Sequence, residues 1–133
     1  MSKVTGVDDY VYKSAGELEA LSVSILSAIG CDEETARFVA FHLIDADIKG
    51  VDSHGVMRLI QYVEQAKEGY FQPRGRPKLK ANDQGAWLVD GEGGFGMPAT
   101  SLAVDTAVIQ AKTQGISAVG VMNCGHAGRL GAF

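Results

Sequence analysis

The stretch VDSHGVMRLI, residues 51–60, brings together an acid, a hydroxyl, an imidazole and a guanidinium. We expect a helix to begin near Ser53 or His54, which puts His54 and Arg58, four residues apart, on one helical face. An arginine can hold a carboxylate through two hydrogen bonds, while a nearby imidazole exchanges a proton with the oxygen or imine nitrogen on the next carbon. The pair therefore suits a 2-oxo or 2-hydroxy acid. A structural interpretation stays open beside it, in which Asp52 and Ser53 cap the helix, His54 makes a local hydrogen bond and Arg58 is solvated.

Two other chemistries fit these residues less well. A hydrolase triad is disfavoured because Asp52, Ser53 and His54 are adjacent and should project in different directions, and no G-x-S-x-G turn is present. A metal site is disfavoured because His42 and Asp45 stand one helical turn apart without a third ligand at a suitable spacing.

A second candidate segment is NCGHAGRLGAF, residues 123–133, which follows a predicted buried strand and should open a helix. Its small residues would let a ligand approach the backbone, and the free amide groups of such a junction favour an anion such as phosphate, which Arg129 could reinforce. The alternative is a glycine-rich turn without a ligand.

The motif GEGGFG, residues 91–96, matches the G-x-G-x-x-G pattern and stands between a predicted strand and a predicted helix. A dinucleotide fingerprint also needs an acidic residue about 20 positions further on. No Asp or Glu follows Asp105, so the sequence favours a plain turn over a Rossmann fingerprint.

Three helices should position the first cluster, over residues 14–30, 32–50 and 53–69. Ser14 and Glu17 form a capping box for the first, Asp32 caps the second, and glycines follow all three. The residues expected to face the core are Leu18, Leu21, Ile25 and Ile29 in the first helix, Ala36, Val39, Leu43 and Ala46 in the second, and Val56, Ile60 and Val63 in the third.

The character of the chain changes at YFQPRGRPKLK, residues 70–80, where prolines and a glycine break any helix. The following pattern predicts two strands around a turn at residues 82–85, a helix with Pro98 in its first turn and Gly115 after its last, and a buried strand at ISAVGVMN. We therefore expect a helical domain at 1–75 and the beginning of an αβ domain at 76–133.

Composition limits the class of protein. The chain has 133 residues, a formal net charge of −4 and 46% hydrophobic residues. An acidic chain lacks the basic face that nucleic acid or an anionic membrane requires, and no apolar run approaches the length of a membrane span. The two cysteines form no CxxC pair, which favours a reducing compartment, and we expect a cytoplasmic protein.

Taken together, D-S-H-G with an arginine four residues after the histidine, a glycine-rich turn after a hairpin, and a strand leading into N-x-x-H-x-G-R-x-G-F resemble the malate/L-lactate dehydrogenase family of NAD(P)-dependent oxidoreductases. That family also includes ureidoglycolate and sulfolactate dehydrogenases and reductases of cyclic imino acids. The resemblance runs from the first capped helix to Phe133. It implies an α/β fold, with an amino-terminal three-helix bundle followed by a mixed-sheet cofactor domain that is not a Rossmann fold.

The resemblance also implies roles for individual residues. Ser53 and His54 match the serine-histidine pair of the family, in which the histidine donates the proton, and Arg58 matches the ligand of the substrate carboxylate. His126 competes with His54 for the acid-base role, and we expect it on the nicotinamide side of the cleft. The stretch that matches a contact with NAD or NADP comprises His126, Ala127, Gly128, Arg129 and Leu130.

Members of this family are longer and usually homodimeric, and the aspartate that completes the serine-histidine relay lies in a part absent from this sequence. We therefore expect the chain to be the amino-terminal part of such an oxidoreductase, acting on a small 2-oxo or 2-hydroxy acid or a cyclic imino acid. The alternative is a truncated, catalytically incomplete piece that acts at most as a folding or association module.

Overall fold

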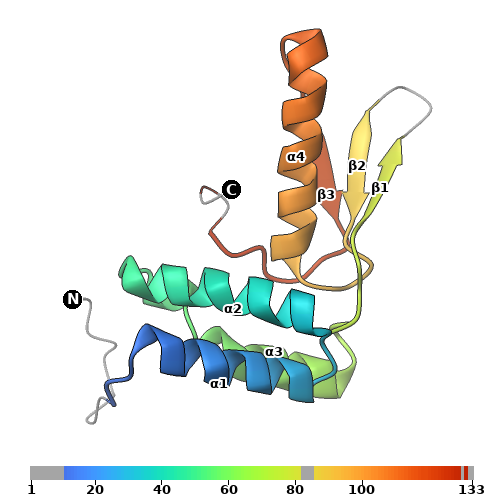
Figure 1. The fold of residues 1–133 in the computed structure, drawn as a ribbon. Coiled ribbons are helices and arrows are strands. Elements are labelled where there is room, and N and C mark those ends of the chain that lie inside the picture. The colour runs from blue at the N-terminus through green and yellow to red at the C-terminus, as the bar shows by residue number, and fades with distance from the viewer. Residues whose placement is uncertain (1–10, 82–85, 130, 132–133) are drawn as a thin grey trace.

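Four α-helices and three strands make up the described part of the computed structural model, which covers residues 11–81, 86–129 and 131. In chain order the elements are α1 (Ala15–Ala28), α2 (Glu33–Ile48), the short 3-10 helix η1 (Asp52–His54), α3 (Arg58–Glu68), β1 (Lys78–Ala81), β2 (Trp87–Asp90), α4 (Gly96–Gln114) and β3 (Val119–Met122). Figure 1 shows α1, α2 and α3 lying together at one end, with α4 standing across them beside the sheet. The arrangement is α/β, as predicted.

The capping box predicted for α1 is confirmed. Glu17 N donates to Ser14 Oγ (3.2 Å), and Ser14 N donates to Glu17 Oε2 (2.9 Å), so two otherwise unpaired amides are satisfied. The predicted core face is partly wrong, because Leu21 is 55% exposed and the buried residues of α1 are Ser22 and Leu26. Ser22 tolerates burial because its Oγ donates to the Leu18 carbonyl at 2.6 Å.

Helix α2 agrees with its sequence prediction at both its start and its buried face. Asp32 Oδ1 accepts a hydrogen bond from Thr35 N at 3.0 Å, which caps the helix. The four residues predicted to face the core all have 0% exposure, namely Ala36, Val39, Leu43 and Ala46.

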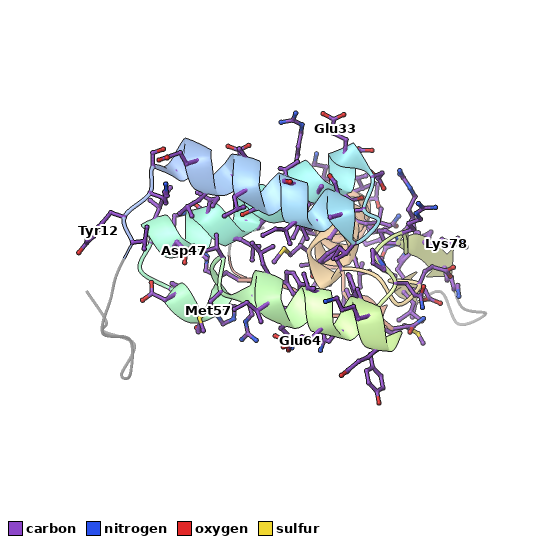
Figure 2. All side chains as sticks on the ribbon, turned by 90° about the horizontal axis from the view of Figure 1, so that it is seen from below. Tyr12, Glu33, Asp47, Met57, Glu64 and Lys78 are labelled. Atoms are coloured by element: carbon purple, nitrogen blue, oxygen red, sulfur yellow. The ribbon has the colours of Figure 1, made fainter. Side chains whose placement is uncertain are left out.

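The third predicted helix is divided into η1 and α3, with a turn between them. Because α3 begins only at Arg58, its buried face differs from the predicted one: Leu59 and Tyr62 are buried, whereas Ile60 is 68% exposed. Figure 2, seen from below, shows Glu33 and Glu64 pointing away from the helices on opposite sides. Gly69 ends α3 in the left-handed conformation, as its position in the sequence predicted.

The sheet has the strand order β1-β2-β3, with β1 antiparallel and β3 parallel to β2. The predicted turn at residues 82–85 lies outside the described residues. Helix α4 connects the two parallel strands and packs Ala99 and Ala103 against Val89 of β2. The prediction that β3 is buried is wrong for the described part of the chain, where Met122 is 46% exposed because β3 forms an edge of the sheet.

Two clusters of buried side chains stabilise this arrangement. One joins the helices and also contains Phe71, Phe95 and Met97, and the other lies between α4 and the sheet. The first cluster therefore ties the start of α4 to the helical half of the chain. Within the described residues, no helix is long and apolar enough to cross a membrane.

Candidate active site

The turn that carries His54 is fixed by a carboxylate of α2. Asp47 Oδ2 accepts a hydrogen bond from Val56 N at 2.9 Å. A Cβ placed on Gly55 would lie only 1.5 Å from Asp47 Oδ1, so the absence of a side chain at residue 55 lets the carboxylate take this position. Burial raises the pKa of Asp47 above its ordinary value, and the nearby Asp52 charge raises it further.

Ser53 and His54 are hydrogen-bonded to each other, with 2.9 Å between Ser53 Oγ and His54 Nδ1. The expectation that adjacent residues project apart is wrong for this pair, since both atoms lie close to their own backbone and suitable rotamers bring them together. Because Nδ1 is engaged in this contact, Nε2 is the ring nitrogen of His54 that can exchange a proton with a substrate.

Arg58 reaches back to η1 from the first position of α3. Its Nε donates to the Ser53 carbonyl at 2.6 Å and its Nη1 donates to Gln61 Oε1 at 2.7 Å. His54 and Arg58 thus belong to different helices, and the predicted single helical face is wrong. Nη2 of Arg58 has no hydrogen-bond partner among the residues that the structure describes.

The structure brings His126 to the same place. The rings of His54 and His126 have centroids 5.1 Å apart, and His126 Nδ1 lies 2.7 Å from the Tyr62 hydroxyl. Burial, with smaller contributions from the neighbouring Arg58 and His54, lowers the pKa of His126 to about 4. Its Nε2 is buried and has no partner within the described part of the chain. His126 is therefore a neutral imidazole at physiological pH.

The turn of residues 91–96 holds the segment that carries His126. Three main-chain hydrogen bonds join them: Gly93 N to Asn123 O at 2.8 Å, Gly125 N to Gly94 O at 2.8 Å and Gly96 N to His126 O at 3.1 Å. A further hydrogen bond, from Gln72 N to Gly93 O at 2.9 Å, joins the loop after α3 to the same turn. We call the main chain of residues 72–75, 91–96 and 123–126 the glycine junction.

Side chains would not fit in the glycine junction. A Cβ on Gly94 would lie 2.5 Å from the Gly75 carbonyl oxygen, and one on Gly96 would lie 2.5 Å from that of Gly125. Close approach of backbones thus explains the glycines of GEGGFG as packing residues. The helix predicted after residue 123 is wrong for residues 124–129, which are irregular, because Asn123 and Gly128 have positive φ values of 51° and 69°.

The other residues of the predicted cofactor stretch lie close by. Ala127 and Gly128 are half-buried against Gly96 and Met97 at the start of α4. Arg129 forms a close ion pair with Asp45 of α2, so its charge is already engaged. Leu130 lies outside the described residues. The predicted anion site around Arg129 stays a prediction.

Tyr62, Asp47 and Gln61 are the members of this cluster that the sequence analysis missed. Tyr62 follows Arg58 by four residues, and this helical spacing is a signal that could have indicated it. Asp47 gave no comparable signal, because its contact with Gly55 depends on how α2 and η1 pack. No group of three or more His, Cys, Asp and Glu side chains suited to a metal occurs among the residues described.

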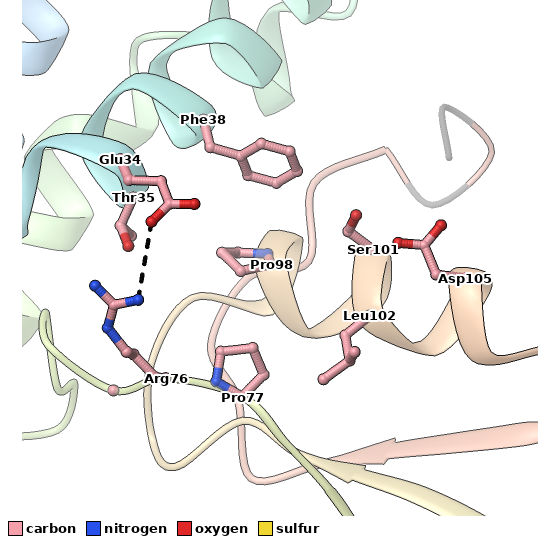
Figure 3. Close-up of a pocket in the computed structure, with 10 residues that line it drawn as sticks. Glu34, Thr35, Phe38, Arg76, Pro77, Pro98, Ser101, Leu102 and Asp105 are labelled. Atoms are coloured by element: carbon pink, nitrogen blue, oxygen red, sulfur yellow. Dashed lines mark ion pairs between the residues drawn. The ribbon is translucent and has the colours of Figure 1, made fainter.

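A separate open groove of about 390 Å³ lies between α2, α4 and the loop before β1 (Figure 3). Its lining consists of Glu34, Thr35, Phe38, Gly75, Arg76, Pro77, Pro98, Ser101, Leu102 and Asp105. Arg76 is paired with Glu34 at 3.9 Å and with Asp32 at 3.2 Å. None of the predicted site residues lines this groove.

The solved structures that resemble this fold include dehydrogenases. The malate dehydrogenase of Entamoeba histolytica superposes with a TM-score of 0.80 at 30% identity, covering 90% of this chain and 34% of that one. The sequence is 36% identical over 126 residues to malate dehydrogenase of Pyrococcus abyssi, covering 95% of this chain and 35% of that protein. It is 33% identical over 110 residues to the Delta(1)-pyrroline-2-carboxylate/Delta(1)-piperideine-2-carboxylate reductase of Pseudomonas putida, covering 83% and 32%.

The profile of the malate/L-lactate dehydrogenase family matches residues 14–133. The chain belongs to this family, as the resemblance indicated. It spans about a third of the length of the curated relatives that it matches.

Proposed function

We propose that the chain is the amino-terminal part of an NAD(P)-dependent oxidoreductase. The reaction would transfer a hydride between the nicotinamide and a small 2-hydroxy or 2-oxo acid, of the malate or lactate type, or a cyclic imino acid. The observation that carries the proposal is the meeting of His54, Arg58 and His126, which come from two segments far apart in the sequence. The activities for which these two relatives are named, malate dehydrogenase and Delta(1)-pyrroline-2-carboxylate/Delta(1)-piperideine-2-carboxylate reductase, are of this chemical class.

Arg58 binds the carboxylate of the substrate in this proposal. Its Nε and Nη1 are held by Ser53 and Gln61, which fixes the plane of the guanidinium while Nη2 keeps its hydrogens for a ligand. A guanidinium that is oriented in advance loses little freedom when it binds a carboxylate.

His54 transfers the proton to or from the oxygen or nitrogen next to that carboxylate. The hydrogen bond between Ser53 Oγ and His54 Nδ1 orients the ring, as a partner on the second nitrogen does for catalytic histidines in general. His126 is less suited to this role because its pKa of about 4 leaves it uncharged at neutral pH.

The segment His126 to Leu130 would hold the nicotinamide side of the cofactor, NAD or NADP. The buried Nε2 of His126 and Nε of Arg129, both without partners among the described residues, fit contact with a polar ligand. When bound, the nicotinamide supplies or accepts the hydride. We extend the proposal to a non-Rossmann cofactor domain beginning near residue 76, a three-helix bundle before it, a homodimeric complete protein and a cytoplasmic location.

Substitution in the complete protein tests these roles. His54→Ala should lower kcat by about 10²- to 10⁴-fold, as loss of a general acid does. Arg58→Leu should mainly raise KM for the acid substrate, and Lys67→Leu, which removes an exposed cation from the same helix, should leave both constants unchanged. Near-normal kinetics for His54→Ala and Arg58→Leu would remove the proposed mechanism.

A measurement of cofactor binding distinguishes the proposed oxidoreductase from the alternative, a chain that acts only as a folding or association module. We expect a saturable change in NADH or NADPH emission, or in the fluorescence of Trp87, when the protein is titrated with the cofactor. A chain that acts as a folding or association module would give no such signal.

A further inference from the structure

Tyr62 is the only described side chain that hydrogen-bonds to the His126 ring, and its own position is fixed by packing. The residue is 2% exposed, and its ring packs edge-on against Phe95, with centroids 5.2 Å apart, and stacks near Phe71. This packing fixes the position of the hydroxyl, which lies 2.7 Å from His126 Nδ1.

The direction of this hydrogen bond follows from counting donors and acceptors. If Tyr62 donates to Nδ1, the His126 proton is on Nε2 and a single buried N–H is left without a partner among the described residues. If Nδ1–H donates to the Tyr62 oxygen, two groups are left, because both the phenolic hydrogen and the Nε2 lone pair then lack partners. Since each unpaired buried polar group is unfavourable, the first arrangement is the more stable one.

We propose that Tyr62 is a positioning residue that fixes His126 in the Nε2–H tautomer and thereby makes this ring a neutral hydrogen-bond donor. The ligand class that such a group recognises is a carbonyl or carboxamide oxygen. A neutral imidazole that donates to a carbonyl oxygen polarises it without transferring a full charge. Only this last step depends on the proposed function, and the tautomer itself does not.

The ionisation of the two partners agrees with this assignment. Burial raises the pKa of Tyr62 above its ordinary value, so the phenol keeps the hydrogen that it donates. The pKa of His126 is lowered, first by burial and then by the positive Arg58, so the ring binds no second proton near neutrality. The two histidines then have different roles: His54 transfers the proton, and His126 donates a hydrogen bond.

The test is the nitrogen-15 NMR spectrum of the histidine side chains at neutral pH, without substrate or cofactor. His126→Gln assigns the signals, Tyr62→Phe removes the hydroxyl, and Tyr70→Phe is the matched control because Tyr70 is 80% exposed. We expect His126 in the unmodified protein and in Tyr70→Phe to show one tautomer, protonated at Nε2. In Tyr62→Phe the Nδ1 signal should shift toward a mixture of both tautomers.

Two results would overturn the proposal: a proton on Nδ1 of His126 in the unmodified protein, or a Tyr62→Phe spectrum identical to that of Tyr70→Phe. Because the measurement needs no turnover, its failure is distinguishable from failure of the proposed function. If the tautomer is as expected but His54→Ala retains full activity, the assignment of Tyr62 stands and the proposed mechanism falls.

Discussion

Replacing Gly55 by alanine should destabilise the protein through a single contact. The added Cβ would lie 1.5 Å from Asp47 Oδ1 and 2.2 Å from Asp47 Cγ, far inside contact distance. Gly55 has a φ of −87°, which alanine adopts freely, so the backbone adds no strain. The carboxylate must move away, and its 2.9 Å hydrogen bond from Val56 N is lost. A hydrogen bond to a charged group contributes about 1.5–3 kcal/mol, which is the expected loss in the free energy of unfolding.

Urea denaturation followed by circular dichroism measures this loss. Gly16→Ala is the matched control, because nothing lies within 4 Å of a Cβ placed on Gly16. Since Gly16 lies in α1 and alanine favours helix more than glycine does, the control should leave stability unchanged or raise it by up to about 1 kcal/mol. The same chemical change should thus lower the free energy of unfolding at Gly55 but not at Gly16.

A double-mutant cycle identifies the cause. In an Asp47→Ala background the obstructing carboxylate is absent, so Gly55→Ala should then have an effect within about 0.5 kcal/mol. If Gly55→Ala is equally harmful with and without Asp47, or harmless in both backgrounds, the contact between these residues does not fix the turn that carries His54.

Three further predictions use the same denaturation measurements. Leu59→Ala should lower stability by about 2–5 kcal/mol, while Ile60→Ala should change it by no more than about 0.5 kcal/mol, and equal effects would contradict the observed face of α3. Asp32→Ala, which leaves Thr35 N uncapped, should lower it by about 1 kcal/mol, whereas Asp32→Asn should largely preserve it. The pKa of His126 falls from 6.5 to about 4 on folding, so its contribution to stability is complete above pH 6.5 and lost as the pH falls toward 4. Urea denaturation of His126→Gln at several pH values should therefore show a stability that depends less on pH in that window, and an unchanged dependence would argue against a buried neutral ring.

Features that depend on neighbours in the sequence could be predicted. The capping box of Ser14 and Glu17 and the cap at Asp32 follow from hydrogen bonds within one turn, and the buried face of α2 follows from helical periodicity. The predicted face of α3 was wrong because η1 ends and a turn intervenes before Arg58, which shifts the phase of the helix. Gly55, which follows η1 directly, is the one local signal that could have indicated that interruption.

Contacts between distant segments could not be predicted from local patterns. The residues that meet at Tyr62 and His126 are 64 positions apart, and their contact depends on the whole first cluster of buried side chains. The resemblance to a family placed His54 and His126 in one cleft, but it did not indicate Tyr62. The exposure of β3 could not be anticipated either, because a run of apolar residues does not reveal whether a strand has neighbours on both sides.

The glycine junction makes the placement of His126 insensitive to ionic strength. Its main-chain hydrogen bonds involve no net charges, and dissolved salt screens charges rather than amide dipoles. Only three residues further along the chain, Arg129 is attached to α2 by an ion pair with Asp45 whose two side chains are 21% and 22% exposed. Dissolved salt should therefore weaken the attachment at Arg129 more than the placement of His126, though less than it would weaken a fully exposed ion pair, because both side chains are mostly buried.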